Sequence, residues 1–351
     1  MNFINRISRK VFSALDFEVE KVSVWIGENK NGQPRSLGLG QAPSRGIRQG
    51  QVTHTGDAVE SVVEALQEAE RQAGTSVGTL YYNFTDPALQ CLVSRGSKTL
   101  KGEGQIRAAD LKEVRQAAER LVGHFERNII YSRETGYTID ERDFVANPLG
   151  VFGRKLDVQM RILTATSALC DTWQKIMSRA GVKRSVRVAS AWSTAYGILP
   201  KEDREIYRLI VDSGGSGDFL NIFIFGNNMI CDHRVVLLDP GTPVSEEGFL
   251  PLLAAAKELL TETFPVEKIL VAGRQNSRGE ISSLLRKSFD LPVSEVSPRS
   301  VQGLENLSQT GLVGLLAVAD ELENKNLILH HDKDLMGTLK EKTATFLSDY
   351  F

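Results

Sequence analysis

The residues best suited to chemistry lie in a glycine-rich turn. Segment 210–218, IVDSGGSGD, joins one apolar run to a second apolar run at 219–225. This pattern predicts a β-hairpin whose tip can bring backbone N–H groups close to a ligand. Asp212 ends the first strand, where a carboxylate can hold a hydrated cation while Gly214 and Gly215 approach phosphate oxygens. The same residues also fit an ordinary tight hairpin without a ligand.

A second pair of β-rich segments, 11–16 and 22–27, lies near the N-terminus, and its first segment again ends in an aspartate, Asp16. Two such hairpins, each opening one half of the chain, predict two related α/β halves that face a cleft. The turn between this first pair has no glycine, serine or threonine. Glu18 and Glu20 stand where a phosphate would bind, and Lys21 is the only compensating charge.

Composition narrows the class of protein. With 351 residues, of which 41% are hydrophobic, the chain can form two or three domains. A net charge of −2 gives no basic surface for nucleic acid, so no nucleic-acid partner is expected. Cys91, Cys170 and Cys231 are widely spaced, which predicts reduced core thiols in a cytoplasmic protein and no metal site. No apolar stretch is long enough to span a bilayer, so any membrane contact would be peripheral.

Strand and helix patterns alternate along the chain, which favours a layered α/β fold. A change of pattern between about 86 and 157 indicates an inserted subdomain. An α/β order returns with a strand at 158–164, and the second half begins near 206. The expected helices cover residues 57–73, 108–122, 167–180, 246–263, 279–289 and 311–322.

Several of these segments carry a family likeness. They are APSRGIRQG at 42–50 with the helix ending AERQAG at 69–74, NPLG at 147–150, and the Asp212 hairpin. On these segments the chain resembles the bacterial cell-division protein FtsA of the actin-like superfamily. The resemblance implies an actin-like two-lobed α/β fold with an inserted α+β subdomain. Its parts would be a first half (1–85 and 158–205), the insertion (86–157), a reduced second half (206–323), and a linker with an amphipathic helix (324–351).

The resemblance also implies ATP and Mg²⁺ between the halves, self-association, an FtsZ-like division partner and a membrane-targeting C-terminal helix. Two departures modify this expectation. The first phosphate turn carries Glu18 and Glu20, and only Gly273 clearly remains of a third, glycine-rich motif. The interval from Phe225 to Val271 has room only for a strand and one helix, where the family has a further subdomain associated with FtsZ and filament contacts. We therefore expect weak or absent ATP hydrolysis, and both contacts are in question.

The last segment, 335–351, forms an amphipathic pattern. Its apolar residues share one side of a helical wheel: Leu335, Met336, Leu339, Phe346, Leu347, Tyr350 and Phe351. Such a helix either binds a membrane surface or docks on the protein's own core. Segment 1–12, with apolar and basic residues, is a competing anchor or a disordered tail.

Together these features predict an FtsA-like peripheral membrane adaptor in bacterial cell division, on the inner face of the cell membrane. The alternatives are an active actin-like ATPase of cell division and a pilus-type or envelope-assembly scaffold with the same fold. No arrangement of serine, cysteine or histidine in the sequence suggests nucleophilic catalysis.

Overall fold

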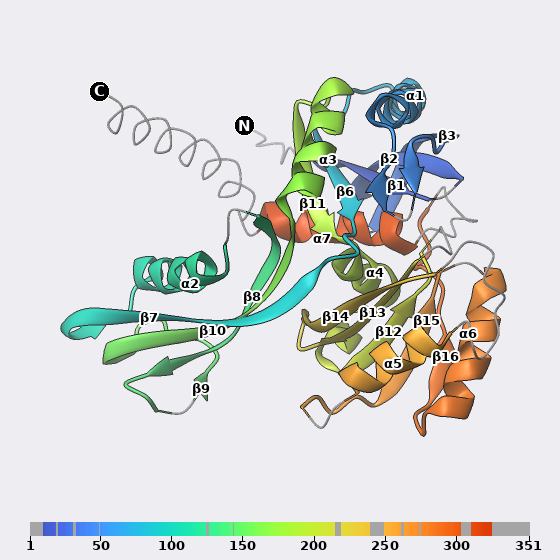
Figure 1. The fold of residues 1–351 in the computed structure, drawn as a ribbon. Helices are drawn as coiled ribbons and strands as arrows, with labels where there is room; N and C mark the ends of the chain where they lie inside the picture. The colour runs from blue at the N-terminus through green and yellow to red at the C-terminus, as the bar shows by residue number, and fades with distance from the viewer. Residues whose placement is uncertain are drawn as a thin grey trace, which may run out of the picture.

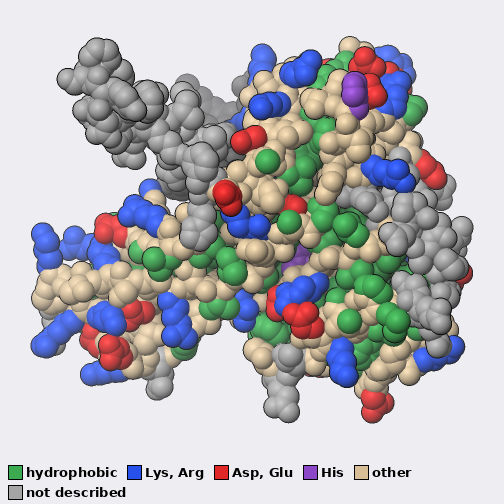
Figure 2. All heavy atoms as spheres, in the orientation of Figure 1, with side chains coloured by type: hydrophobic (Ala, Val, Ile, Leu, Met, Phe, Trp, Pro, Cys, Tyr) green, Lys and Arg blue, Asp and Glu red, His purple; other side chains and the backbone are tan. Residues whose placement is uncertain are grey.

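The computed structural model describes residues 10–18, 20–30, 33–48, 50–123, 126–142, 144–214, 219–238, 249–260, 263–273, 275–302 and 310–324. These residues form three larger β-sheets with helices packed on them, together with a two-stranded sheet of β4 (Ile47–Arg48) and β5 (Gln51–Val52) (Figure 1). On the face drawn in Figure 2, basic and acidic side chains are interspersed. The predicted α/β fold class is confirmed.

The first sheet has the strand order β11-β6-β1-β2-β3. Strands β1 (Lys10–Phe17), β2 (Lys21–Lys30) and β3 (Gln33–Pro43) are antiparallel neighbours, as the first predicted hairpin requires. Strands β6 (Thr79–Phe84) and β11 (Arg184–Ala189) continue the sheet in parallel with β1. Helices α1 (Thr55–Ala73) and α3 (Ser167–Arg179) share an apolar core with this sheet. Gly74 ends α1 in the left-handed conformation, as its sequence predicts.

The second sheet repeats this plan with the order β14-β13-β12-β15-β16. An antiparallel hairpin of β12 (Arg208–Asp212) and β13 (Phe219–Gly226) lies beside the parallel strand β15 (Lys268–Ala272). Strands β14 (Met229–Leu237) and β16 (Val293–Glu295) form its edges. Helices α5 (Leu250–Leu259) and α6 (Gln275–Ser288) complete this half, and α5 contributes to an apolar core with the sheet.

The expected helix at 246–263 is therefore shorter than its sequence pattern indicates, since α5 occupies only Leu250–Leu259. Between Phe225 and Lys268 the described residues contain β14 and α5 and no other strand or helix. This agrees with the expected room for one strand and one helix.

The third sheet, of order β7-β10-β8-β9, extends to one side of the molecule (Figure 1). It contains β7 (Gln90–Gln105), β8 (Arg127–Ile139), β9 (Phe144–Val145) and β10 (Phe152–Thr166). Helix α2 (Ala108–Val122) packs on it around a separate apolar core. Strand β10 pairs with β7 as far as Thr164, so segment 158–164, expected in the first half, lies in this sheet. We call this sheet together with α2 the inserted sheet.

Two further helices lie where the halves meet, and they pack closely on each other. Helix α4 (Ser190–Ile198) has no counterpart among the predicted elements, whereas α7 (Thr310–Asn324) matches the expected helix at 311–322. A Cβ atom added at Gly314 would overlap the carbonyl oxygen of Ser193, so the glycine permits the close approach of these helices. A short 3₁₀ helix, η1 (Lys201–Glu205), follows α4.

Candidate functional site

The candidate site is centred on the two aspartates that end equivalent strands. Asp16 stands near the end of β1, and Asp212 is the last residue of β12. The two carboxylates are close enough for the charge of Asp212 to raise the pKa of Asp16. The structure therefore brings together the residues that the two hairpins predict.

The Asp16 carboxylate occupies an environment poor in water. Burial raises its pKa to about 7, a hydrogen bond with the Asn83 side chain opposes this shift, and the nearby carboxylate of Glu18 adds to it. The backbone N–H of Phe17 donates to Oδ1 over 2.9 Å. An aspartate that is half protonated near neutral pH is a weak anionic ligand unless a cation lowers its pKa.

Asp212 is held by two donors. The Thr194 hydroxyl of α4 donates to Oδ2 over 2.5 Å, and the backbone N–H of Gly214 donates to Oδ1 over 2.9 Å. Asp212 is only 5% exposed, and burial raises its pKa. The adjacent Ser193 hydroxyl donates to Oδ1 of Asn83 on β6 over 2.5 Å. Helix α4 therefore contacts Asp212 directly and also the asparagine that hydrogen-bonds to Asp16.

Two glycines complete the surroundings of these aspartates. Gly273 follows β15 with a φ of +106°, and a Cβ atom there would overlap the Ser213 hydroxyl. Gly311 is the second residue of α7, and a Cβ atom there would overlap the Asn83 amide nitrogen and come within 3.1 Å of Asp16 Oδ2. Glycine therefore lets the Gly273 backbone approach the Ser213 turn and the Gly311 backbone approach Asn83 and Asp16.

The β1–β2 turn differs from the second hairpin in its charges. The backbone N–H of Glu18 donates to the Lys21 carbonyl over 2.9 Å, which closes the turn. The Glu18 side chain is 9% exposed, and its carboxylate lies 3.8 Å from the Lys21 ammonium group. Lys21, the lysine of this turn, therefore faces a carboxylate of the turn itself.

These contacts allow a test of whether ATP and Mg²⁺ fit. Two carboxylates and the Thr194 hydroxyl, all oxygen ligands, suit a hydrated Mg²⁺ ion. The β1–β2 turn does not suit a phosphate, because the buried Glu18 carboxylate repels it and offsets the charge of Lys21. The described residues therefore suit the Mg²⁺ ion of the expected ATP–Mg²⁺ ligand. The β1–β2 turn does not suit the phosphates of that ligand.

Sequence reasoning missed Asn83, Ser193, Thr194 and Gly311, which all lie around the two aspartates. Among the predicted candidates Gly215 lies outside the described residues, as do all seven apolar residues of the tail. No group of three or more His, Cys, Asp or Glu side chains placed to hold a metal ion occurs in the described part of the chain. None of its helices is both long and apolar enough to cross a membrane.

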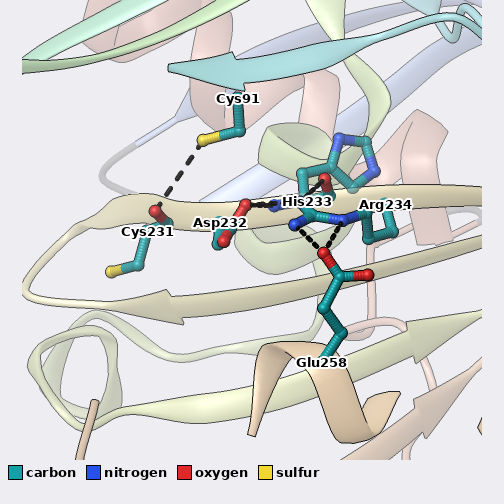
Figure 3. A network of polar contacts seen from close by, with 6 residues as sticks. All are labelled: Cys91, Cys231, Asp232, His233, Arg234 and Glu258. Carbon is teal, nitrogen blue, oxygen red and sulfur yellow. Dashed lines mark hydrogen bonds and ion pairs between the residues drawn. The ribbon is translucent and has the colours of Figure 1, made fainter. Parts of the chain in front are cut away.

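A second polar network lies around β14, and its contacts join this strand to neighbouring elements of the fold (Figure 3). Arg234 binds Asp232 over 2.8 Å and Glu258 of α5 over 2.6 Å, which ties α5 to the sheet. The Cys91 thiol of β7 lies 3.8 Å from the Cys231 carbonyl oxygen. Burial raises the pKa of both thiols to about 12, which disfavours the nucleophilic thiolate form. All three cysteines are free, and Cys170 and Cys231 are buried as predicted, whereas Cys91 is only partly buried.

Comparison with solved structures defines the class of fold. The chain superposes on a PilM-PilN type IV pilus biogenesis complex with a TM-score of 0.59 and 14% identity, over 87% of this chain and 96% of that one. It superposes on MreB5 of Spiroplasma citri bound to ADP with a TM-score of 0.50 and 10% identity, over 91% and 98% of the two chains. The fold is actin-like, with two halves and the aspartates between them.

Comparison with sequences then gives the particular likeness. Residues 88–164 match the family model of the SHS2 domain inserted in FtsA. The chain is 26% identical to the cell division protein FtsA of Pseudomonas aeruginosa over 62% of this chain and 52% of the relative. Identity to FtsA of Rhizobium meliloti is 31% over 56% and 44%. The resemblance to FtsA is confirmed, and the chain spans about half the length of the curated relatives it matches.

Proposed function

We propose that this protein is an FtsA-like adaptor that links a membrane surface to a bacterial division assembly, with weak or absent ATP hydrolysis. The sequence similarity to FtsA supports the division role, and the actin-like fold supports a cleft able to receive a nucleotide. The partner in this proposal is an FtsZ-like division protein, and self-association is a further expected property.

The observation that carries the low-ATPase part is the carboxylate pair Asp16 and Glu18. Burial raises the pKa of Asp16, and the nearby Glu18 carboxylate raises it further. A triphosphate placed at the β1–β2 turn would add negative charge beside them. Stabilising the developing charge of phosphate transfer needs donors or cations at that point, and the described turn has only Lys21, which faces Glu18.

Membrane attachment in this proposal rests on the amphipathic pattern of 335–351, which lies outside the described residues. Peripheral attachment on the inner face of the cell membrane would place a cytoplasmic actin-like body beside a division assembly. The candidate site residues Asp16, Lys21, Asp212, Gly214, Gly215 and Gly273 would then form a cleft that binds nucleotide weakly.

Two measurements on the full chain test this function. Calorimetry with ATP and Mg²⁺ should show weak binding, and turnover should be close to background. Liposome co-sedimentation should show binding that disappears when 335–351 is removed. Tight ATP binding together with turnover abolished by Asp212→Ala would replace the adaptor with the active ATPase.

The second candidate is an envelope-assembly scaffold of the pilus type. It is favoured by the superposition on the PilM-PilN complex, which covers nearly the whole of that chain. Deletion of the gene separates the candidates, because a division adaptor gives filamentous cells and a pilus scaffold gives cells that divide normally but lack the surface appendage.

A further inference from the structure

A cavity of about 790 Å³ lies apart from the two aspartates, where β8, α4, η1, α7 and the turn between β13 and β14 meet. Its volume falls within the usual range for sites that bind small organic molecules. Part of the wall is apolar and includes Phe12, Val313 and Leu316. Another part carries Lys201, Arg204 and Arg299.

The two arginines are fixed against the C-terminal end of α4. The Arg204 guanidinium stacks over the Tyr196 ring, 3.7 Å from its centroid, and its Nε donates to the Leu199 carbonyl over 3.3 Å. Arg299 donates through Nη2 to the Tyr196 carbonyl over 2.8 Å. The last carbonyls of a helix carry partial negative charge, so these contacts hold both cations in place.

These contacts leave most of the guanidinium donors for a ligand. Each guanidinium has five N–H groups, and the hydrogen bonds above use one on each side chain. Among the ion pairs of the described residues, none includes Arg204, Arg299 or Lys201. Partial burial and the nearby charge of Arg204 lower the pKa of Arg299, and the Glu202 carboxylate opposes this shift.

Three of the four acidic residues on the cavity wall form ion pairs with arginines other than Arg204 and Arg299. Glu28 lies 3.5 Å from Arg35, Glu134 lies 3.5 Å from Arg115, and Glu321 lies 2.6 Å from Arg133. Asp320 is the fourth acidic residue of the wall. Asp320 is therefore the wall carboxylate left outside these pairs, and Glu202, beside Lys201, is a further acidic neighbour of Arg299. The case for an anion rests on the unused guanidinium donors of Arg204 and Arg299, which lie beside Lys201.

We propose that Lys201, Arg204 and Arg299 form a binding site for a small organic anion that carries a carboxylate or phosphate group on an apolar body. Arginine side chains bind such groups through paired N–H donors. The apolar body lies against Phe12, Val313 and Leu316. This site is separate from the nucleotide cleft and does not depend on the proposed adaptor function.

Octyl phosphate, used below its micelle concentration, is the probe because it joins both parts. Isothermal titration with the full chain should show binding at least about tenfold tighter than that of inorganic phosphate or octanol alone, since each of these lacks one set of contacts. Equal binding of inorganic phosphate would overturn the apolar part of the site, and equal binding of octanol would overturn the anion site.

Substitutions locate the binding. Arg299→Gln and Lys201→Gln change exposed side chains, and each should weaken octyl phosphate binding by about tenfold. Lys175→Gln, on the exposed face of α3, is the matched control and should leave binding unchanged. Arg204 is only 9% exposed, so Arg204→Gln is interpreted only if its melting temperature is retained. Unchanged affinity in both Arg299→Gln and Lys201→Gln would reject the proposal.

A vesicle comparison distinguishes a lipid phosphate from a soluble anion. Vesicles with and without phosphatidic acid are sedimented with the wild-type protein and with Arg299→Gln. A loss of binding in Arg299→Gln that is specific to phosphatidic acid supports the site with a lipid headgroup as its ligand. Equal vesicle binding, together with weaker octyl phosphate binding, supports the site with a soluble anion.

Discussion

At the scale of single residues, the cleft is dominated by carboxylates whose charges are poorly compensated. Asp16 has its pKa raised to about 7 by burial and by its acidic neighbours. An unfolded aspartate titrates near 3.8, so between about pH 4 and pH 7 the unfolded chain releases a proton that the folded chain retains. The stability contributed by this group is present below pH 4, declines as the pH rises to about 7, and is constant above that.

Asp16→Asn removes the loss of stability that accompanies ionisation of Asp16 in the folded protein, because asparagine stays neutral. We expect its free energy of unfolding at pH 8 to exceed that of the wild type by on the order of 2 kcal/mol, and its pH dependence between 5 and 7 to flatten. Urea denaturation at pH 5, 6, 7 and 8 measures both. Asp171→Asn, on α3 at the surface, is the control and should follow the wild type. A variant less stable than the wild type at pH 8 would show that the Asp16 charge stabilises the fold.

Glu18 and Glu20 provide a matched pair for testing the phosphate turn. Glu18 is buried beside Asp16 and Lys21, whereas Glu20 is exposed. Glu18→Ser removes the nearby charge and frees Lys21, so ATP–Mg²⁺ should bind it about tenfold more tightly, and Glu20→Ser should have a smaller effect. Calorimetry compares the two. Equal effects would mean that Glu18 does not control access of phosphate to the turn.

At the scale of elements, the hairpins and amphipathic helices could be predicted because their patterns are local. Asp16 and Asp212 were found because each follows an apolar strand and precedes a turn. Helix α4 could not be found in this way, since every residue from Ala191 to Ile198 is buried and the helix has no polar face to give a period. Thr194, the hydroxyl partner of Asp212, was missed with it. The nearest local signal is Pro200, just beyond the helix end.

The packing of α4 on α7 depends on Gly314. Gly314→Ala places a methyl group against the Ser193 carbonyl, so the helices must separate, and we expect a loss of roughly 2 kcal/mol or more in unfolding free energy. Gly279→Ala in α6 is the matched control, because no atom lies within 4 Å of the added Cβ and alanine favours the helix by up to about 1 kcal/mol. Chemical denaturation gives both values. A neutral Gly314→Ala would show that the two helices have room to move.

The tail tests the membrane part of the proposal. Phe346→Glu should release the protein from liposomes without lowering its melting temperature, because a charge on a lipid-facing stripe opposes insertion. Thr343→Ser in the same segment is a mild control that should leave sedimentation unchanged. If Phe346→Glu instead lowers the melting temperature and leaves liposome binding intact, the segment docks on the protein.

At the scale of the whole molecule, the apolar cores divide the chain unevenly. Phe223, Phe225 and Ile230 of the second sheet belong to the same core cluster as Leu15 and Val24 of the first sheet. The inserted sheet has a separate core around Leu156 and Val158. The two halves therefore share one cluster, which the inserted sheet joins mainly through one end of β8 and β10, and the second half has a further cluster of its own. Local unfolding should follow this division.

Leu156→Ala and Leu15→Ala test this division, since both side chains are fully buried leucines. Each truncation should lower the unfolding free energy of the core that contains it by about 2 to 5 kcal/mol. Hydrogen exchange measured by mass spectrometry should show that Leu156→Ala lowers protection in β7, α2 and β8 while β1 and β12 keep theirs. Leu15→Ala should lower protection in β1 and β12 together, because Ile210 of β12 belongs to the same core cluster as Leu15. Equal loss of protection in β12 from both variants would mean that the inserted sheet unfolds only with the rest of the molecule.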